Sequence, residues 1–184
     1  RKQKQSLSFR FKMTITSVIL MIPVIALVIF YVFKNEKSFG GANGDYRTKG
    51  SGLWSDISIW EKYNSGSWGA ATTAPVAGDK DITILTGHVV TVNAATTMDQ
   101  VTIDAGGQII LNSGVTLTLA NGTGTDLTVM GIFTNAGTVS IAASAVMSVE
   151  SGGTYQHNYT NSAGTIPTVT WNSNSNCDII GYTD

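Results

Sequence analysis

Short stretches in which apolar and polar residues alternate recur through most of the chain after residue 81. Examples are Ile82–Ile84, Val101–Ile103 and Leu117–Leu119, each with a central threonine. A period of two, together with many β-branched residues, predicts half-buried β-strands. The same pattern predicts further strands over residues 90–92, 109–111, 127–129, 139–141, 146–149 and 169–171.

The spacing of these stretches predicts the architecture. Gly- and Asn-containing turn signals separate them, and their centres lie roughly 8–10 residues apart. A β-sandwich, a barrel and a parallel β-solenoid all fit this spacing. The strands are very short and share one apolar-Thr-apolar form, as stacked coils require, so the pattern favours an all-β, right-handed parallel β-helix with coils of about 25 residues. The β-sandwich is the main alternative, although the Cys…Trp…Cys frame of immunoglobulin-like sandwiches is absent.

The N-terminal part of the chain has a different character. Residues 13–33 hold 21 consecutive uncharged residues, preceded by five basic residues and followed by Lys34. Such a run is long enough to cross a bilayer as a helix, and its basic flank predicts that everything after it is exported. We therefore expect residues 1–37 to act as a signal peptide or as an uncleaved signal anchor, with residues 13–33 contacting the membrane.

Composition divides the remainder of the chain. Residues 38–52 are Gly-rich and polar and predict a linker. Residues 53–80 contain Trp54, Trp60 and Trp68 and predict a Trp-rich cap on the first coil, and residues 81–184 predict the β-helix coils. The chain stops shortly after an apolar stretch at 177–182, so we expect that further coils follow in the complete protein.

Charge excludes some classes of function. Residues 1–39 carry seven basic residues and one acidic residue, whereas residues 40–184 carry four basic and eleven acidic residues. The exported part has no basic patch that could neutralise phosphates, which argues against nucleic-acid binding. One cysteine, Cys177, excludes an internal disulfide, and its place in an apolar stretch predicts a buried thiol. We expect no metal site and no cofactor.

The region from Gly52 onward contains four motifs in succession. They are a Gly-x-Trp-Ser-Asp…Trp opening, a Pro-containing turn, a Gly-His-x-Val-x-Val strand and an apolar-Thr-Ile…Gly-Gly strand. The residues of these motifs are Gly52, Trp54, Ser55, Asp56, Trp60, Pro75, Gly87, His88, Val90, Val92, Val101, Ile103, Gly106 and Gly107. In this order, the motifs resemble the opening of β-helix repeat regions in large exported surface proteins of Bacteroidetes. The resemblance covers about residues 46–184 and implies a pectin-lyase-like β-helix with an adhesin-like role at the cell surface.

Candidate catalytic residues are sparse. No Lys or Arg follows Lys80, which argues against lyase chemistry in this part of the chain. Hydrolysis of a glycoside needs two nearby carboxyl groups, and stacking of coils makes Asp104 and Asp126 the best such pair. Because isolated acids more often lie in turns, we assign no catalytic residue. His88 and His157 lie far apart in sequence and predict no metal site.

The tryptophans allow two interpretations. Exposed, Trp54, Trp60 and Trp68 could stack on sugar rings and form a glycan-binding surface. Buried, they would cover the first coil, and the large apolar area of each ring favours this second interpretation.

The sequence therefore predicts a non-enzymatic structural or adhesive module of an exported cell-surface protein, either secreted or anchored by the N-terminal helix. Its expected partners are surface glycans or other cell-surface proteins. The alternatives are the N-terminal part of a carbohydrate-active β-helix enzyme and a glycan-binding module.

Overall fold

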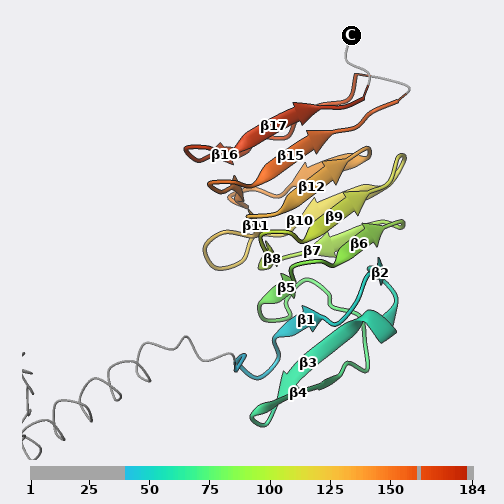
Figure 1. Ribbon diagram of the computed structural model, residues 1–184, viewed down its shortest axis with the longest axis vertical. Helices are drawn as coiled ribbons and strands as arrows, with labels where there is room; N and C mark the ends of the chain where they lie inside the picture. Colours follow the sequence, from blue (N-terminus) through green and yellow to red (C-terminus); the bar gives the residue numbers. More distant parts are fainter. Residues whose placement is uncertain (1–39, 161–162, 182–184) are drawn as a thin grey trace, which may run out of the picture. The chain divides into compact units, whose positions relative to one another are not determined.

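The computed structural model describes residues 40–160 and 163–181 and shows a parallel β-solenoid of about four turns. Successive coils stack one above another, so that strands distant in sequence lie side by side (Figure 1). The prediction of an all-β, right-handed parallel β-helix is confirmed, and the β-sandwich alternative is wrong. The apolar run at residues 13–33 lies outside the described residues. Within the described ranges, no helix is long and apolar enough to cross a membrane.

Three parallel sheets form the walls of the solenoid over the described residues. We call them sheets A, B and C, in the order in which each coil visits them. Sheet A contains β1 (Tyr46–Thr48), β5 (Ile82–Ile84), β8 (Val101–Ile103), β11 (Leu127–Val129), β14 (Met147–Val149) and β16 (Thr170–Trp171). Sheet B contains β2 (Gly52–Leu53), β6 (Val89–Val92), β9 (Gln108–Leu111), β12 (Ile132–Asn135), β15 (Thr154–His157) and β17 (Asn176–Ile179). Sheet C contains β7 (Thr96–Met98), β10 (Thr116–Leu119) and β13 (Thr138–Ile141).

The register of the sheets explains the alternating sequence pattern. In sheet A, Ile82 lies opposite Val101, Val101 opposite Leu127, and Leu127 opposite Met147. These side chains are buried and form one column of the core, whereas the threonines between the apolar positions face outward. Each fully buried side chain of this size contributes roughly 1.5–3 kcal/mol to folding. Repetition of the same column in every coil therefore builds a core that runs along the stack.

Several strands do not show the expected alternation. They are β7, β12, β15 and β17, whose sequences are TTM, IFTN, TYQH and NCDI. Polar residues occupy inward positions in three of them, namely Thr96 in β7, Asn135 in β12 and His157 in β15. Asn135 and His157 are buried but satisfied, since the Asn135 amide donates to the Tyr155 hydroxyl at 2.9 Å and a His157 ring nitrogen lies 2.6 Å from the Ala163 carbonyl.

The first coil begins earlier than composition predicts. Tyr46–Thr48 forms β1, which pairs with β5, although it lies inside the Gly-rich stretch expected to be a linker. Tyr46 and Thr48 are buried, and this burial accounts for the strand. A short 3-10 helix (Ile57–Ile59) leads from β2 into β3 (Trp60–Asn64) and β4 (Ser67–Ala70), an antiparallel hairpin that pairs with β1 at one end of sheet A.

Candidate functional site

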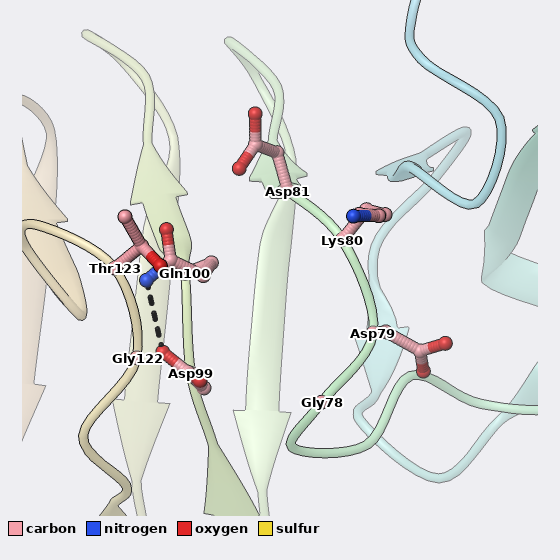
Figure 2. Close-up of a pocket in the computed structure, with 8 residues that line it drawn as sticks. All are labelled: Gly78, Asp79, Lys80, Asp81, Asp99, Gln100, Gly122 and Thr123. Atoms are coloured by element: carbon pink, nitrogen blue, oxygen red, sulfur yellow. Dashed lines mark hydrogen bonds between the residues drawn. The ribbon is translucent and has the colours of Figure 1, made fainter.

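A hollow of about 410 Å³ lies at one corner of the solenoid, where sheet C leads into sheet A. Three successive coils contribute to it. The first supplies the loop before β5, the second the two residues between β7 and β8, and the third the longer turn between β10 and β11. The lining residues are Gly78, Asp79, Lys80, Asp81, Asp99, Gln100, Gly122 and Thr123 (Figure 2).

The middle coil turns this corner with two residues, Asp99 and Gln100. Gln100 adopts a left-handed backbone conformation with φ of 54°, as a two-residue corner demands. Its side-chain amide donates to the Asp99 carboxylate at 3.1 Å, the contact drawn in Figure 2. Asp99 is thereby held at the floor of the hollow, with only 8% of its surface exposed.

The third coil turns the same corner with a longer loop, which Asp126 organises. One Asp126 oxygen accepts from the Gly122 amide at 2.7 Å, and the other accepts from the Val146 amide at 2.6 Å. Asp126 is fully buried, and its carboxylate satisfies two backbone donors that would otherwise lose their water partners. Its geometry is therefore that of a structural residue.

Asp99 and Asp126 form an acid pair across adjacent coils. Desolvation raises the pKa of Asp99, and the neighbouring Asp126 carboxyl raises it further, against the opposing effect of the Gln100 hydrogen bonds. The Asp99 carboxyl also lies directly against Gly122, where a Cβ would collide with it. A carboxyl group held in this way takes up a proton more readily than an exposed one.

Three charged side chains line the rim of the hollow. Lys80 and Asp81 are exposed, and Asp79 is half-buried with its carboxylate 3.4 Å from the Lys62 ammonium. The hollow therefore combines acids, one ammonium, an amide and the Thr123 hydroxyl. This set of groups suits a polar ligand that has several hydrogen-bonding groups.

The structure does not bring together the acids that the sequence pairs. Asp104 follows the last residue of β8, whereas Asp126 precedes the first residue of β11. Since Val101 pairs with Leu127 and Ile103 with Val129, the two acids lie at opposite ends of neighbouring strands. The prediction of an Asp104–Asp126 pair is wrong, and Asp99 is the actual partner of Asp126. Burial raises the pKa of Asp104 without a second acid.

The structure separates the three tryptophans. Trp54 and Trp60 are buried, with their ring centres 5.1 Å apart, and their indole nitrogens donate to the carbonyls of Pro75 and Trp54. Neither ring offers a face to a sugar, which corrects the stacking prediction for these two residues. Trp68 is half-buried on the hairpin, where Tyr63 meets it edge-on at 5.2 Å and the Arg47 guanidinium lies 4.3 Å from its ring centre.

The histidines and the cysteine lie apart from the hollow. His88 contacts the Thr48 hydroxyl at 2.8 Å, and His157 belongs to the buried group around Tyr155. Within the described residues, no cluster of side chains could hold a metal ion. Cys177 is exposed, which corrects the expectation of a buried thiol, because its inward position on β17 has no covering coil among the described residues.

Sequence reasoning missed the main residues of the hollow, which are Asp99, Gln100, Lys80 and Thr123. A prediction of β7 would have indicated two of them, because Asp99 and Gln100 form the corner between β7 and β8. Comparison with models of protein families, with curated proteins and with solved structures finds no match to this chain.

Proposed function

We propose that this chain is a non-enzymatic structural and adhesive module of an exported cell-surface protein. The observation that carries the proposal is the regular solenoid, whose outer surface bears columns of uncharged polar side chains. On sheet A, for example, the half-exposed Thr83, Thr102 and Thr128 follow one another in register. A stack of this kind suits a module that extends away from the cell and adheres to other surfaces.

Hydrogen bonds along the outer face of sheet B support a rigid role. The Gln108 amide donates to the Thr134 hydroxyl at 2.9 Å, and that hydroxyl donates to the Gln156 side-chain oxygen at 2.7 Å. Three coils are thus joined by side chains as well as by backbone. Residues 105–125 and 127–149 contain no charged residue. The surface of these coils therefore does not favour partners of either charge.

The Trp-rich segment fits the role of a cap in this proposal. The β3–β4 hairpin lies at the end of sheet A, and Trp54 and Trp60 pack with Tyr46 beside the first coil. Such a cap shields the first coil from edge pairing with other chains. The apolar run at 13–33 would direct export and, if retained, anchor the module in the membrane. The resemblance of residues 46–184 to β-helix regions of Bacteroidetes surface proteins supports a location at the cell surface.

A glycan-binding module is the second candidate, and the Trp68 environment favours it. Trp68 and Tyr63 are both partly exposed on the hairpin, and Arg47, in contact with Trp68, pairs with Glu61 at 2.8 Å. Aromatic rings beside an ion pair can hold the apolar face and the hydroxyl groups of a sugar. A carbohydrate-active enzyme is the third candidate, and the Asp99 carboxyl in the hollow is the acid on which such an activity would depend.

One experiment separates the three candidates. The full chain is incubated with a panel of polysaccharides, and both retention and released oligosaccharides are measured. The structural and adhesive proposal expects retention without release, unchanged in Trp68→Ala. Loss of retention in Trp68→Ala, but not in the control Trp171→Ala, would favour the glycan-binding module. Release of oligosaccharides that Asp99→Asn abolishes would overturn the non-enzymatic proposal.

A further inference from the structure

The outer face of sheet C carries a two-dimensional array of hydroxyl groups. In β10 and β13, two outward residues alternate with buried or half-buried ones, and β7 contributes one more outward residue. Thr116 lies opposite Thr138, and Thr118 lies opposite both Ser140 and Thr97. The array consists of Thr97, Thr116, Thr118, Thr138 and Ser140.

The spacing of this array follows from the geometry of the sheet. Neighbouring strands lie about 4.8 Å apart, and outward residues on one strand lie about 6.6 Å apart, twice the rise per residue. The inward side chains of Leu117, Leu119 and Met98 are fully buried, so the strands are held from beneath. The hydroxyls therefore form a regular grid on a rigid support.

The hydroxyls of the array are available to water. Thr97, Thr116, Thr138 and Ser140 are exposed, and Thr118 is half-exposed at the centre. Within residues 40–160 and 163–181, none of the five hydroxyls hydrogen-bonds to another side chain or to the backbone. Thr96, which points the other way, instead donates to the Ala94 carbonyl at 2.8 Å. Each free hydroxyl can donate one hydrogen bond and accept two.

The chemistry of the face narrows the class of partner. β7, β10 and β13 contain no charged residue, so the face cannot pair with a charged surface. They also contain no aromatic ring and no amide, the groups that usually hold sugars. Single hydroxyls and methyl groups at regular intervals suit a neutral partner that repeats with the same periods. Ice presents a neutral surface of this kind, in which oxygen atoms repeat regularly at intervals of a few ångströms.

We propose that the outer face of sheet C binds ice. The hydroxyl grid orders a layer of water, and that layer joins the lattice of a growing crystal. This inference rests on the proposed adhesive role and names ice as the surface to which the module adheres.

The test measures how much of the full chain, kept in a mild detergent, a slowly growing ice crystal takes up from solution. We expect uptake above that of an inert marker protein. Thr118→Lys places a long charged side chain at the centre of the grid and should reduce uptake to the marker level. Thr102→Lys makes the same change on the outer face of sheet A and should leave uptake unchanged.

Thr138→Lys provides a second variant at an exposed position, in case Thr118→Lys does not fold. Uptake of the unaltered chain at the marker level would overturn the proposal, as would full uptake by a folded Thr118→Lys or Thr138→Lys variant. Retention on a polysaccharide, measured separately, distinguishes failure of ice binding from failure of the adhesive role.

Discussion

Asp99 is the residue at which folding and protonation are most directly coupled. It lies in the hollow with little exposed surface, beside Asp126, and its pKa lies above the ordinary value of 3.8. The folded chain therefore holds this proton more tightly than the unfolded chain does. The stabilising contribution is fully present below about pH 3.8 and is lost as the pH rises through the raised pKa.

We predict that Asp99→Asn weakens the dependence of stability on pH. Asparagine cannot ionise, so the variant avoids the cost that ionised Asp99 imposes near neutral pH. Relative to the variant, the unaltered chain should gain free energy of unfolding as the pH falls from neutral to about 4. Denaturant unfolding at several pH values measures this difference.

Asp178→Asn is the matched control, because it removes an exposed carboxylate from the last coil without touching the hollow. It should not reproduce the change. Parallel stability curves for the unaltered chain and Asp99→Asn would contradict the coupling.

At the scale of elements, the turns from sheet A to sheet B depend on glycines that meet neighbouring backbone. Gly107, Gly131 and Gly153 each directly precede a strand of sheet B, and their strands pair in register. A Cβ on Gly107 would lie 2.8 Å from the Ile84 carbonyl oxygen, and one on Gly131 would collide with the carbonyls of Gly107 and Asp104. Coils can stack closely at this corner because these residues have no side chain.

We predict that Gly131→Ala lowers the free energy of unfolding by about 1–3 kcal/mol, because backbone carbonyls cannot move aside as a flexible side chain can. Gly69→Ala is the control, since nothing lies within 4 Å of its Cβ position, and it should change stability by less than about 0.5 kcal/mol. Thermal or denaturant unfolding compares the two. Equal changes in the free energy of unfolding for Gly131→Ala and Gly69→Ala would show that contact between a Cβ at position 131 and the backbone carbonyls does not destabilise the fold.

Strands with a repeated apolar-Thr-apolar pattern could be predicted from sequence, because each buries two residues on a shared core. Ile82–Ile84, Val101–Ile103 and Leu127–Val129 match β5, β8 and β11. Strands whose inward residues are polar, such as Asn135 and His157, could not, because their burial depends on partners supplied by other residues.

The candidate site could not be predicted for a related reason. Val101 follows its partner Ile82 by 19 residues, whereas Leu127 follows Val101 by 26. The longer coil contains the turn that Asp126 organises. If every coil had the same length of about 22 residues, Asp104 would lie opposite Asp126. Because the coil lengths differ, the observed register instead places Asp99 beside Asp126.

At the scale of the whole solenoid, the first and last coils of the described residues differ. Within residues 40–160 and 163–181, the first coil pairs with the β3–β4 hairpin, while the coil of β16 and β17 leaves Trp171, Cys177 and Ile179 exposed. Each coil of a solenoid is stabilised mainly by its neighbours. A coil with a neighbour on one side only should therefore open more easily than a coil in the middle.

We predict that the amides of β16 and β17 exchange with solvent fastest among the strands, and that those of β9, β10 and β12 exchange slowest. β5 should be nearly as protected as the centre, because β1 and the hairpin lie beyond it. Hydrogen exchange followed by mass spectrometry or NMR measures the gradient. Uniform protection from β5 to β17 would show that the described coils unfold together, without the expected local opening.

The direction of the hydrogen bonds in the solenoid has a mechanical consequence. The strands run across the stack, so the bonds that join β12 to β15 point along its axis. Tension along this axis therefore pulls each ladder apart directly, bond by bond, and does not shear many bonds at once. Tyr155 follows its partner Phe133 by 22 residues, so one detached coil converts a step of about 4.8 Å into roughly 70 Å of extended chain. Under load the solenoid would lengthen in discrete steps, each absorbing work before the next coil yields.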